Sequence, residues 1–291
     1  MPFPLADITV VDLSHVLAGP YCSMILADLG ARVIKVERPG LGDDTRHFPP
    51  FRDGESAYFA AINRGKQSIA LDLKDAADRA LFERLLSKAD VLVENFRPGV
   101  MARLGYGWEA LHARYPGLIY GAVSGFGHTG PDAQKPAYDM VVQARSGLMS
   151  ITGEQNREPV RVGASVGDIV GGMFLAQGIT AALYERLQTG RGRKVDVAML
   201  DGQLAILEHA IAITNETGHP PGCVWLWGWT HCPRIAARNM VVELANPKGG
   251  KPYLAAGNPI KISDMDDTLP DARAPTLDGD RAAVLKWLDA G

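Results

Sequence analysis

Several residue types and segments are scarce in this sequence, and each absence excludes a class of protein. The 291 residues include only Cys22, Cys223 and Cys232 as cysteines, too few and too unevenly placed for a disulfide framework. No uninterrupted apolar run approaches the roughly 20 residues that a bilayer span needs. The N-terminus also lacks the basic and apolar regions of a secretory signal. These absences predict a soluble protein, without a membrane partner, in the reducing cytoplasm.

Positive charge is not in excess either. Thirty Lys and Arg residues against 33 Asp and Glu residues give a formal net charge of −3, so the sequence offers no basic field for nucleic acid. His219, Cys223, His231 and Cys232 gather in one segment, but their spacing matches no zinc motif. We therefore expect neither a nucleic-acid partner nor a metal site.

Three common enzyme motifs are missing. Gly-Lys-Ser/Thr never occurs at the spacing of a Walker A motif, and SHVLAGPYC stands where a dinucleotide-binding enzyme would carry G-x-G-x-x-G. The segment around Ser124 lacks the leading glycine of a hydrolase G-x-S-x-G elbow. The sequence therefore disfavours a P-loop enzyme, a Rossmann dehydrogenase and a serine hydrolase.

Predicted strands and helices alternate from residue 8 to about residue 200. Short β-branched runs predict strands at Ile8–Asp12, Arg32–Glu37, Ser68–Asp72, Val91–Glu94, Leu118–Ser124 and Arg193–Ala198. The stretches between them predict helices at Pro20–Leu29, Asp75–Lys88 and Val166–Leu187. This alternation is typical of an α/β fold, with an open parallel sheet and flanking helices, that binds ligands at the carboxyl ends of its strands.

The pattern changes after residue 217 and divides the chain into three parts. Residues 1–217 are predicted to form the α/β domain, and residues 218–238 form a junction that carries Trp225, Trp227 and Trp229. Residues 239–291 are predicted to return to the α/β domain. Further strands are predicted at Asn239–Ala245 and Tyr253–Ile262, and a short helix at Gly279–Leu288.

Charged residues near the predicted strand ends and helix starts are the candidate functional groups. Eight cations near strand ends suit an anionic ligand that carries phosphate, although a solvated charged rim has the same pattern. They are Lys35, Arg38, Arg46, Arg64, Lys66, Lys74, Arg97 and Arg103. Asp139 opens a helix-like run, and Asp168 follows small residues at the start of the longest predicted helix. Either carboxylate could act as a nucleophile or simply cap a helix.

Eight motifs, in order over about 200 residues, resemble the class III CoA-transferases, the family also named after L-carnitine dehydratase and the bile-acid-inducible protein F. They are VVDLSHVLAGP, VIKVERPGLGDDTR, INRGKQSIALDLK, ADVLVENFRPGVMARLGYGW, SGFGHTGP, PAYDMVVQARSGLMSITG, VGASVGDIVGG and GRGRKVDVAMLDG. The resemblance implies the CoA-binding large domain of that family. The small domain that family members carry after the segment matching residues 200–217 is largely missing here.

The resemblance also implies a reaction and its residues. CoA would pass from an acyl-CoA to a free carboxylic acid through an aspartyl-CoA thioester on Asp168, with Asp139 and Tyr138 as further active-site residues. The positions implied to bind CoA are His15, Val16, Leu17, Ala18, Arg38, Leu71, Lys74, Asn95, Phe96, Arg97 and Arg103. CoA is then a substrate, no cofactor is tightly bound, and the family's interlocked homodimer is the expected assembly.

Two alternatives stay open. The missing small domain shields reactive intermediates in the family, so the chain could instead be a catalytically impaired remnant that binds acyl-CoA. The 2-methylacyl-CoA racemases of the superfamily carry His where this chain has Tyr138, and tyrosine is a poor proton carrier near neutral pH. Among transferases, Leu17, SGFGHTGP, PAYD and GNPIKIS look most like acetyl- or formyl-CoA:oxalate CoA-transferases, which makes oxalate a candidate acceptor.

Overall fold

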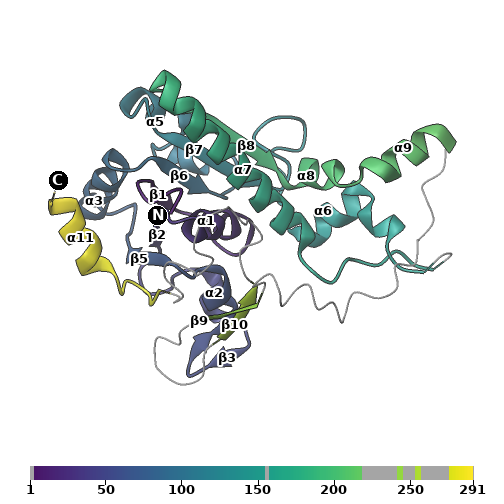
Figure 1. The fold of residues 1–291 in the computed structure, drawn as a ribbon, viewed down its shortest axis with the longest axis horizontal. Coiled ribbons are helices and arrows are strands. Elements are labelled where there is room, and N and C mark those ends of the chain that lie inside the picture. Colours follow the sequence, from purple (N-terminus) through teal and green to yellow (C-terminus); the bar gives the residue numbers. More distant parts are fainter. Residues whose placement is uncertain (1–2, 155–156, 218–240, 245–252, 257–274, 291) are drawn as a thin grey trace.

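A six-stranded parallel sheet is the centre of the computed structural model, which describes residues 3–154, 157–217, 241–244, 253–256 and 275–290 (Figure 1). The strand order is β5-β2-β1-β6-β7-β8. The strands are β1 (Thr9–Asp12), β2 (Arg32–Glu37), β5 (Lys66–Ala70), β6 (Val91–Glu94), β7 (Ile119–Ser124) and β8 (Lys194–Ala198). The chain order runs outward from the middle on both sides, so this is a doubly wound sheet with its switch point between β1 and β6.

The predicted strands are present, and the α/β class is confirmed. Five of them agree with the structure to within one residue at each end. The exception is Ser68–Asp72, because β5 begins at Lys66 and ends at Ala70, where it pairs with β2 from Val33 to Glu37. A lysine can start this buried strand because its ammonium group lies in an internal ion pair, which the sequence pattern does not reveal.

The helices agree less completely with the sequence pattern. α1 (Ala18–Asp28), α3 (Ala76–Ser87) and α7 (Val166–Thr189) correspond to the predicted helices, and Asp75 caps α3 by accepting from the backbone N–H groups of Ala77 and Asp78. The remaining helices are α2 (Ala57–Ile62), α4 (Val100–Arg103), α5 (Trp108–Arg114), α6 (Asp139–Ser146), α8 (Met199–Ala205), α9 (Glu208–Thr217) and α11 (Arg281–Asp289), with the 3-10 turns η1 (Asp44–His47) and η2 (Leu148–Ile151).

Two small antiparallel pairs complete the described elements. β3 (Phe51–Arg52) pairs with β4 (Glu55–Ser56), and β9 (Val241–Leu244) pairs with β10 (Tyr253–Ala256). The second pair falls within the two strands predicted near the C-terminus. The predicted junction at residues 218–238 lies outside the described residues, with Trp225, Trp227 and Trp229.

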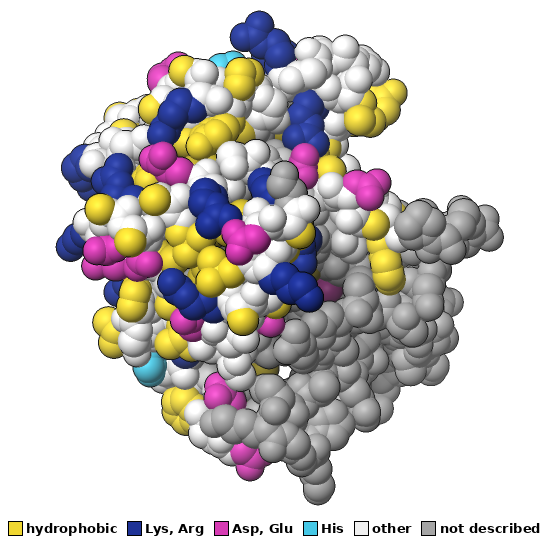
Figure 2. All heavy atoms as spheres, turned by 90° about the vertical axis from the view of Figure 1, so that its left-hand side faces the viewer, with side chains coloured by type: hydrophobic (Ala, Val, Ile, Leu, Met, Phe, Trp, Pro, Cys, Tyr) yellow, Lys and Arg dark blue, Asp and Glu magenta, His cyan; other side chains and the backbone are white. Residues whose placement is uncertain are grey.

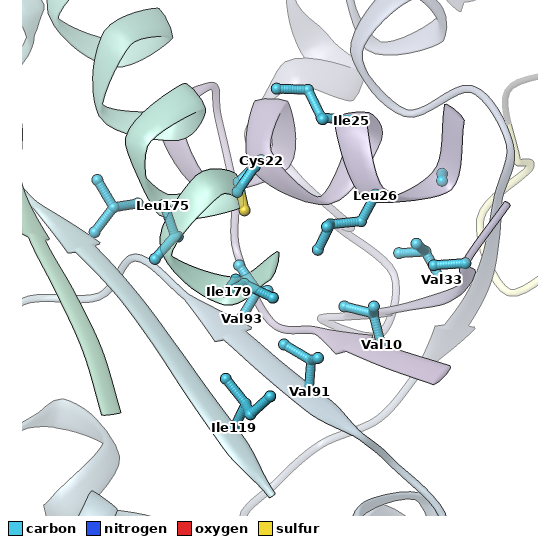
Figure 3. Close-up of a cluster of buried hydrophobic side chains, with 14 of the residues drawn as sticks. Val10, Cys22, Ile25, Leu26, Val33, Val91, Val93, Ile119, Leu175 and Ile179 are labelled. Carbon is cyan, nitrogen blue, oxygen red and sulfur yellow. The ribbon is translucent and has the colours of Figure 1, made fainter. Parts of the chain in front are cut away.

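Each face of the sheet has its own hydrophobic core, because alternate residues of a strand point to opposite faces. Val10, Val33 and Val93 pack under α1 and α7, as Figure 3 shows. Val11 and Ile34, one position along their strands, pack instead with residues of α3, α4, α5 and α11. Burial on both faces explains why these strands are almost continuously apolar in sequence.

The helix α7 packs one of its faces into the domain. By length and composition alone it could cross a membrane. In the fold it contacts α1, β7 and β8, and its buried positions include Gly171, Gly172 and Ala176. Packing accounts for the apolar residues of this face, whereas Tyr184 and Leu187 are exposed.

The C-terminal segment covers the open edge of β5. Side chains replace a neighbouring strand there: Asp280 accepts from the Ser68 backbone N–H at 3.1 Å, and Asp278 accepts from that of Ala70 at 2.9 Å. Arg281 donates to the Ala70 carbonyl at 2.9 Å. The backbone groups of an edge strand are thereby satisfied without an adjoining strand. Basic and acidic side chains are interspersed on the face at the left of Figure 1 (Figure 2).

A network of buried ion pairs lies below the carboxyl ends of β1, β2 and β5. The ammonium group of Lys66 lies 3.1 Å from the carboxylate of Asp12, and both side chains are inaccessible to solvent. Lys66 also donates to the Pro20 carbonyl at 3.0 Å and to the Asn63 side chain at 2.9 Å. Asp12 accepts from the Ser23 hydroxyl at 2.6 Å. The network therefore joins β1 and β5 to the start of α1.

A second pair ties β2 to the loop after β1. Lys35 Nζ lies 2.9 Å from the carboxylate of Asp43 and donates to the Ser14 carbonyl at 2.7 Å. Ser14 donates its backbone N–H and its hydroxyl to Asp12. Burial by itself would raise the pKa of Asp12, but the charges of Lys66 and Lys35 outweigh burial and hold that pKa below its usual range. Charge compensation thus keeps this interior site ionised.

Two further ion pairs correct the expectation that all the cations near strand ends are available to a ligand. Arg46 donates to both carboxylate oxygens of Glu37, at 2.7 and 2.6 Å, and Arg64 donates to both of Asp28, at 3.1 and 2.5 Å. With the two lysines above, half of the eight cations have carboxylate partners in the interior. The expectation is wrong for these four residues. The exposed cations are Arg38, Lys74, Arg97 and Arg103.

Replacement of Lys66 by methionine tests the buried network, because methionine keeps an unbranched chain and removes the charge. We expect K66M to lower the free energy of unfolding by about 3–5 kcal/mol, since Asp12 loses its partner in the interior. Urea unfolding at neutral pH measures the change. The control R193A breaks an exposed pair with Glu185 and should change stability by less than about 1 kcal/mol. Equal losses in the two variants would contradict the prediction.

Candidate active site

A pocket of about 620 Å³ opens where β1, β2 and β5 end, next to the switch point of the sheet. Its lining includes five of the positions expected to bind CoA, which come from four separate loops. They are His15, Arg38, Leu71, Lys74 and Phe96. Lys35 and Asp43 of the buried network form part of the wall. The fold therefore brings together residues that lie up to 81 positions apart in the chain.

The loops after β1 and β6 are joined across the switch point. The Asn95 side chain accepts from the backbone N–H of His15 at 2.9 Å and donates to the His15 carbonyl at 2.7 Å. The ring centroids of His15 and Phe96 are 5.4 Å apart. Asn95 is absent from the pocket lining, so it contributes by holding the His15 loop.

Val16 has an unusual backbone conformation at the centre of this loop. Its φ of 66° lies in the left-handed region, which is unfavourable for a β-branched residue. Its backbone N–H donates to the Asp43 carboxylate at 3.2 Å, so the buried network stabilises the turn. Leu17 and Ala18 follow as the buried start of α1. Of these three expected CoA-binding residues, only the backbone of Val16 has a position next to the pocket wall.

Two carboxylates lie together at the start of α7. Asp168 is half-buried in the first turn of this 24-residue helix. Asp139 is buried at the start of α6, where it accepts from the Gly167 backbone N–H at 2.8 Å and from the Gln143 side chain at 2.7 Å. Through these bonds Asp139 connects α6 to the residue that precedes Asp168.

The charge state of Asp168 differs from that of an exposed carboxylate. Burial, and then the neighbouring charge of Asp139, raise the pKa of Asp168 to about 7. Its ionised form is therefore more basic than an ordinary aspartate, and the backbone N–H groups of a helix's first turn favour negative charge nearby. The arrangement suits a nucleophilic carboxylate.

Tyr58 of α2 is electrostatically coupled to an acid of the pocket wall and to one of the carboxylate pair. Burial, and then the charges of Asp168 and Asp43, raise the pKa of Tyr58 to about 12. Its ring centroid is 6.2 Å from that of Phe48. The pKa of Tyr58 therefore responds both to Asp43 of the pocket wall and to Asp168 of the carboxylate pair.

Gly172 sets the distance between α7 and the start of α1. A Cβ atom at this position would lie 2.6 Å from the carbonyl oxygen of Ala18 and 3.2 Å from the backbone nitrogen of Cys22. Only glycine permits this approach, because both obstructing atoms belong to the backbone. Asp168 is four residues before Gly172 and shares its helix face, so the contact directs Asp168 toward the β1–α1 loop.

The remaining expected residues lie at the margin of the site. Arg97 and Arg103 are exposed and are absent from the pocket lining. The side chain of Tyr138 is 79% exposed, although Asp139 beside it is buried. Within the described residues, no cluster of three or more His, Cys, Asp or Glu side chains could hold a metal ion. His219, Cys223, His231 and Cys232 lie outside the described residues.

The sequence reasoning missed four residues that shape the site: Asp43, Tyr58, Gln143 and Gln203. Gln203 accepts from the Ser146 hydroxyl at 2.8 Å, and its amide nitrogen is buried near Gly167. Only Gln143 had a local signal, because it follows Asp139 by four residues and so shares a helix face with it. The others approach the carboxylates from distant segments, which no spacing in the sequence indicates.

This geometry defines a doubly wound α/β protein with a pocket at its switch point and a pair of neighbouring carboxylates at the starts of α6 and α7. Residues 5–224 match the sequence profile of CoA-transferase family III. The chain therefore belongs to CoA-transferase family III.

Individual relatives agree with this assignment. The chain is 53% identical over 219 residues to acetyl-CoA:oxalate CoA-transferase of Acetobacter aceti, a match that covers 75% of this chain and 56% of the relative. It is 44% identical over 210 residues to human succinyl-CoA:glutarate CoA-transferase, covering 72% and 48%. The chain thus spans about half the length of the curated relatives it matches.

A solved structure resembles the whole chain. A CAIB/BAIF family protein from Brucella suis matches with a TM-score of 0.90 and 30% identity, covering 99% of this chain and 100% of that chain. The fold is therefore that of a known group of structures.

A methyl group at position 172 tests the contact between α7 and α1. We expect G172A to lower the free energy of unfolding by about 1–3 kcal/mol, because the Ala18 and Cys22 backbone atoms would have to move. Thermal and urea unfolding measure the change. The control is G163A, whose Cβ would meet nothing within 4 Å and should leave stability nearly unchanged. If G172A were as stable as G163A, the close approach would not constrain the helix.

Proposed function

We propose that this chain is a CoA-transferase that uses Asp168 as its nucleophile. The observation that carries the proposal is the half-buried Asp168 at the start of α7, whose pKa is raised by burial and by the neighbouring buried carboxylate of Asp139. Membership of CoA-transferase family III supports this role over that of a helix cap. So does its position, because the N-cap residue of α7 is Ser165 and Asp168 lies three residues further, inside the first turn.

The pocket is the proposed site of the CoA moiety. Its volume of about 620 Å³ is within the range of small-molecule sites, and its lining combines apolar side chains with polar and charged ones of both signs. Arg38 and Lys74 are exposed at its rim, where they can meet phosphate groups as a fork and as a point charge. Leu71, His15 and Phe96 offer apolar and ring surfaces deeper in the pocket. CoA thus acts as a substrate.

The reaction proceeds by four acyl transfers. The Asp168 carboxylate attacks the thioester carbonyl of the donor, and CoA thiolate leaves, so that a mixed anhydride forms. The thiolate then attacks the Asp168 carbonyl, which releases the donor acid and leaves an aspartyl-CoA thioester. The acceptor carboxylate displaces the thiolate to give a second anhydride. Finally the thiolate attacks the acceptor carbonyl, and Asp168 is regenerated.

Acetyl-CoA and oxalate are the proposed donor and acceptor. The relative that uses them by name is 53% identical to this chain, whereas the relatives named for citramalate and glutarate are 43% and 44% identical. All of these acceptors are small carboxylic acids, so the class of acceptor is shared. The homodimeric assembly and the cytoplasmic location remain predictions from the sequence.

Covalent labelling of Asp168 tests the reaction. We expect that incubation with acetyl-CoA leaves an acetyl or CoA adduct on the peptide that contains Asp168, because the mixed anhydride and the thioester are both acyl derivatives of that carboxylate. Mass spectrometry of the digested protein detects it, and oxalate should discharge it. D168N should still bind CoA but show no adduct, with CoA transfer reduced by about 10³-fold or more.

Other outcomes of this experiment would assign other functions. Discharge by succinate or glutarate but not by oxalate would replace the acceptor. CoA binding with no adduct would identify an acyl-CoA-binding remnant. Solvent deuterium at C2 of a 2-methylacyl-CoA, with no adduct, would identify a racemase. An adduct of equal amount on D168N would reject Asp168 as the nucleophile.

The pH dependence of the reaction tests the electrostatics of Asp168. Its raised pKa means that the ionised, reactive form increases as the pH rises through about 7, so kcat/KM should rise and then level off. D139N removes the neighbouring charge while its amide oxygen can still accept from Gly167, so the rise should move to lower pH by about one unit. Measurements of kcat/KM from about pH 5.5 to about pH 8.5 in the wild type and in D139N test both expectations. An identical profile in D139N would contradict the coupling of the two acids.

A further inference from the structure

Glu94, at the end of β6, is a buried acid that the proposed reaction does not use. Its side chain is 2% exposed. One carboxylate oxygen accepts from the Phe96 backbone N–H at 2.7 Å, and the other accepts from the Tyr120 hydroxyl at 2.9 Å. It thus joins the neighbouring strand β7 to the loop that carries Asn95 and Phe96.

This loop is part of the pocket. Phe96 lines it directly, and the Asn95 side chain holds both backbone groups of His15. A shift of the Phe96 backbone would therefore move Asn95, and with it the His15 loop on the other side of the switch point. Among the described residues, only the Glu94 side chain accepts a hydrogen bond from the Phe96 N–H.

The buried environment of Glu94 disfavours its charged form. Burial raises the pKa of Glu94 to about 7, although the hydrogen bonds from Phe96 and Tyr120 and the charge of Lys194 act in the opposite direction. Asp196 adds a like charge, and His128 Nε2 lies 3.6 Å away without a hydrogen-bond partner. Glu94, His128 and Lys194 border a separate cavity of about 390 Å³ that residues of α4 and α5 also line. An apolar residue would avoid the desolvation cost, but it could not hydrogen-bond the Phe96 N–H and the Tyr120 hydroxyl.

We propose that Glu94 is a positioning residue: its carboxyl group fixes the Asn95–Phe96 loop in the conformation that the CoA pocket requires. The proposal rests on the proposed function of that pocket. It does not depend on the charge of Glu94, because a neutral group with one acceptor and one donor can hold the same partners. The Tyr120 hydroxyl then accepts instead of donating, while Phe96 keeps its acceptor.

Two variants at position 94 separate the need for hydrogen bonds from the need for a charge. E94Q keeps an oxygen for Phe96 and an N–H for Tyr120, so its KM for acetyl-CoA should stay within about twofold of the wild-type value. E94L fills a similar volume without polar atoms, so its KM should rise about tenfold, the effect of one lost hydrogen bond. In both variants kcat at saturation should stay within about twofold, since Asp168 is untouched. The control is E83L, which removes another Glu–Tyr pair, with Tyr106, away from the loop.

Hydrogen exchange of the ligand-free proteins gives a readout that needs no CoA. E94L should speed amide exchange at residues 95–97 and at His15 and Val16, whereas E94Q and E83L should not. If the wild-type protein bound no CoA and E94L still showed this local effect, the proposed function would fail but the positioning role would stand. Unchanged exchange in E94L, or a fall in kcat with faster exchange across the whole sheet, would overturn the positioning role.

Discussion

The buried charge compensation under β1 and β2 is the constraint on which the candidate site depends. Asp12 and Lys66 hold β1, β5 and the start of α1 together, while Lys35 and Asp43 hold β2 to the loop that follows β1. Loops at strand ends usually vary in conformation because water can satisfy their polar groups. Here a change of loop conformation would leave an unpaired charge in the interior, which is far more costly. The pocket wall is therefore formed before any ligand binds.

This network also decides how charge is distributed around the pocket. Lys35, Arg46, Arg64 and Lys66 are neutralised by carboxylates, so the positive charge left for a ligand is that of exposed residues. Arg38 itself contacts Asp44 at 2.5 Å at the surface, where exchange with another anion costs little. The interior of the site provides shape and hydrogen bonds, and its rim provides charge. That division suits a ligand with phosphates at one end and an uncharged, reactive group at the other.

The carboxylate pair combines two opposing effects. Burial and the charge of Asp139 make Asp168 more basic, which favours attack on a carbonyl, but they also reduce the ionised fraction near neutral pH. A pKa of about 7 keeps a substantial fraction of Asp168 ionised at neutral pH while retaining the gain in basicity. Asp139 is fixed by Gly167 and Gln143 and cannot turn away, so the coupling of the two acids is built into the packing of α6 against α7.

The sequence by itself determined the α/β class, the positions of the six parallel strands, the long helix α7 and the family, with Asp168 at a helix start. These features depend on local periodicity and short motifs, and both are written in consecutive residues. Tertiary structure alone decided which cations are free, since Asp12 and Lys66 are 54 residues apart and a charge pair leaves no local pattern. It also coupled the titration of Tyr58 to Asp168 and brought the Glu94 carboxylate to the Phe96 backbone N–H. Hydrogen bonds and Coulomb interactions depend on distances in space, and only the packed fold sets those distances.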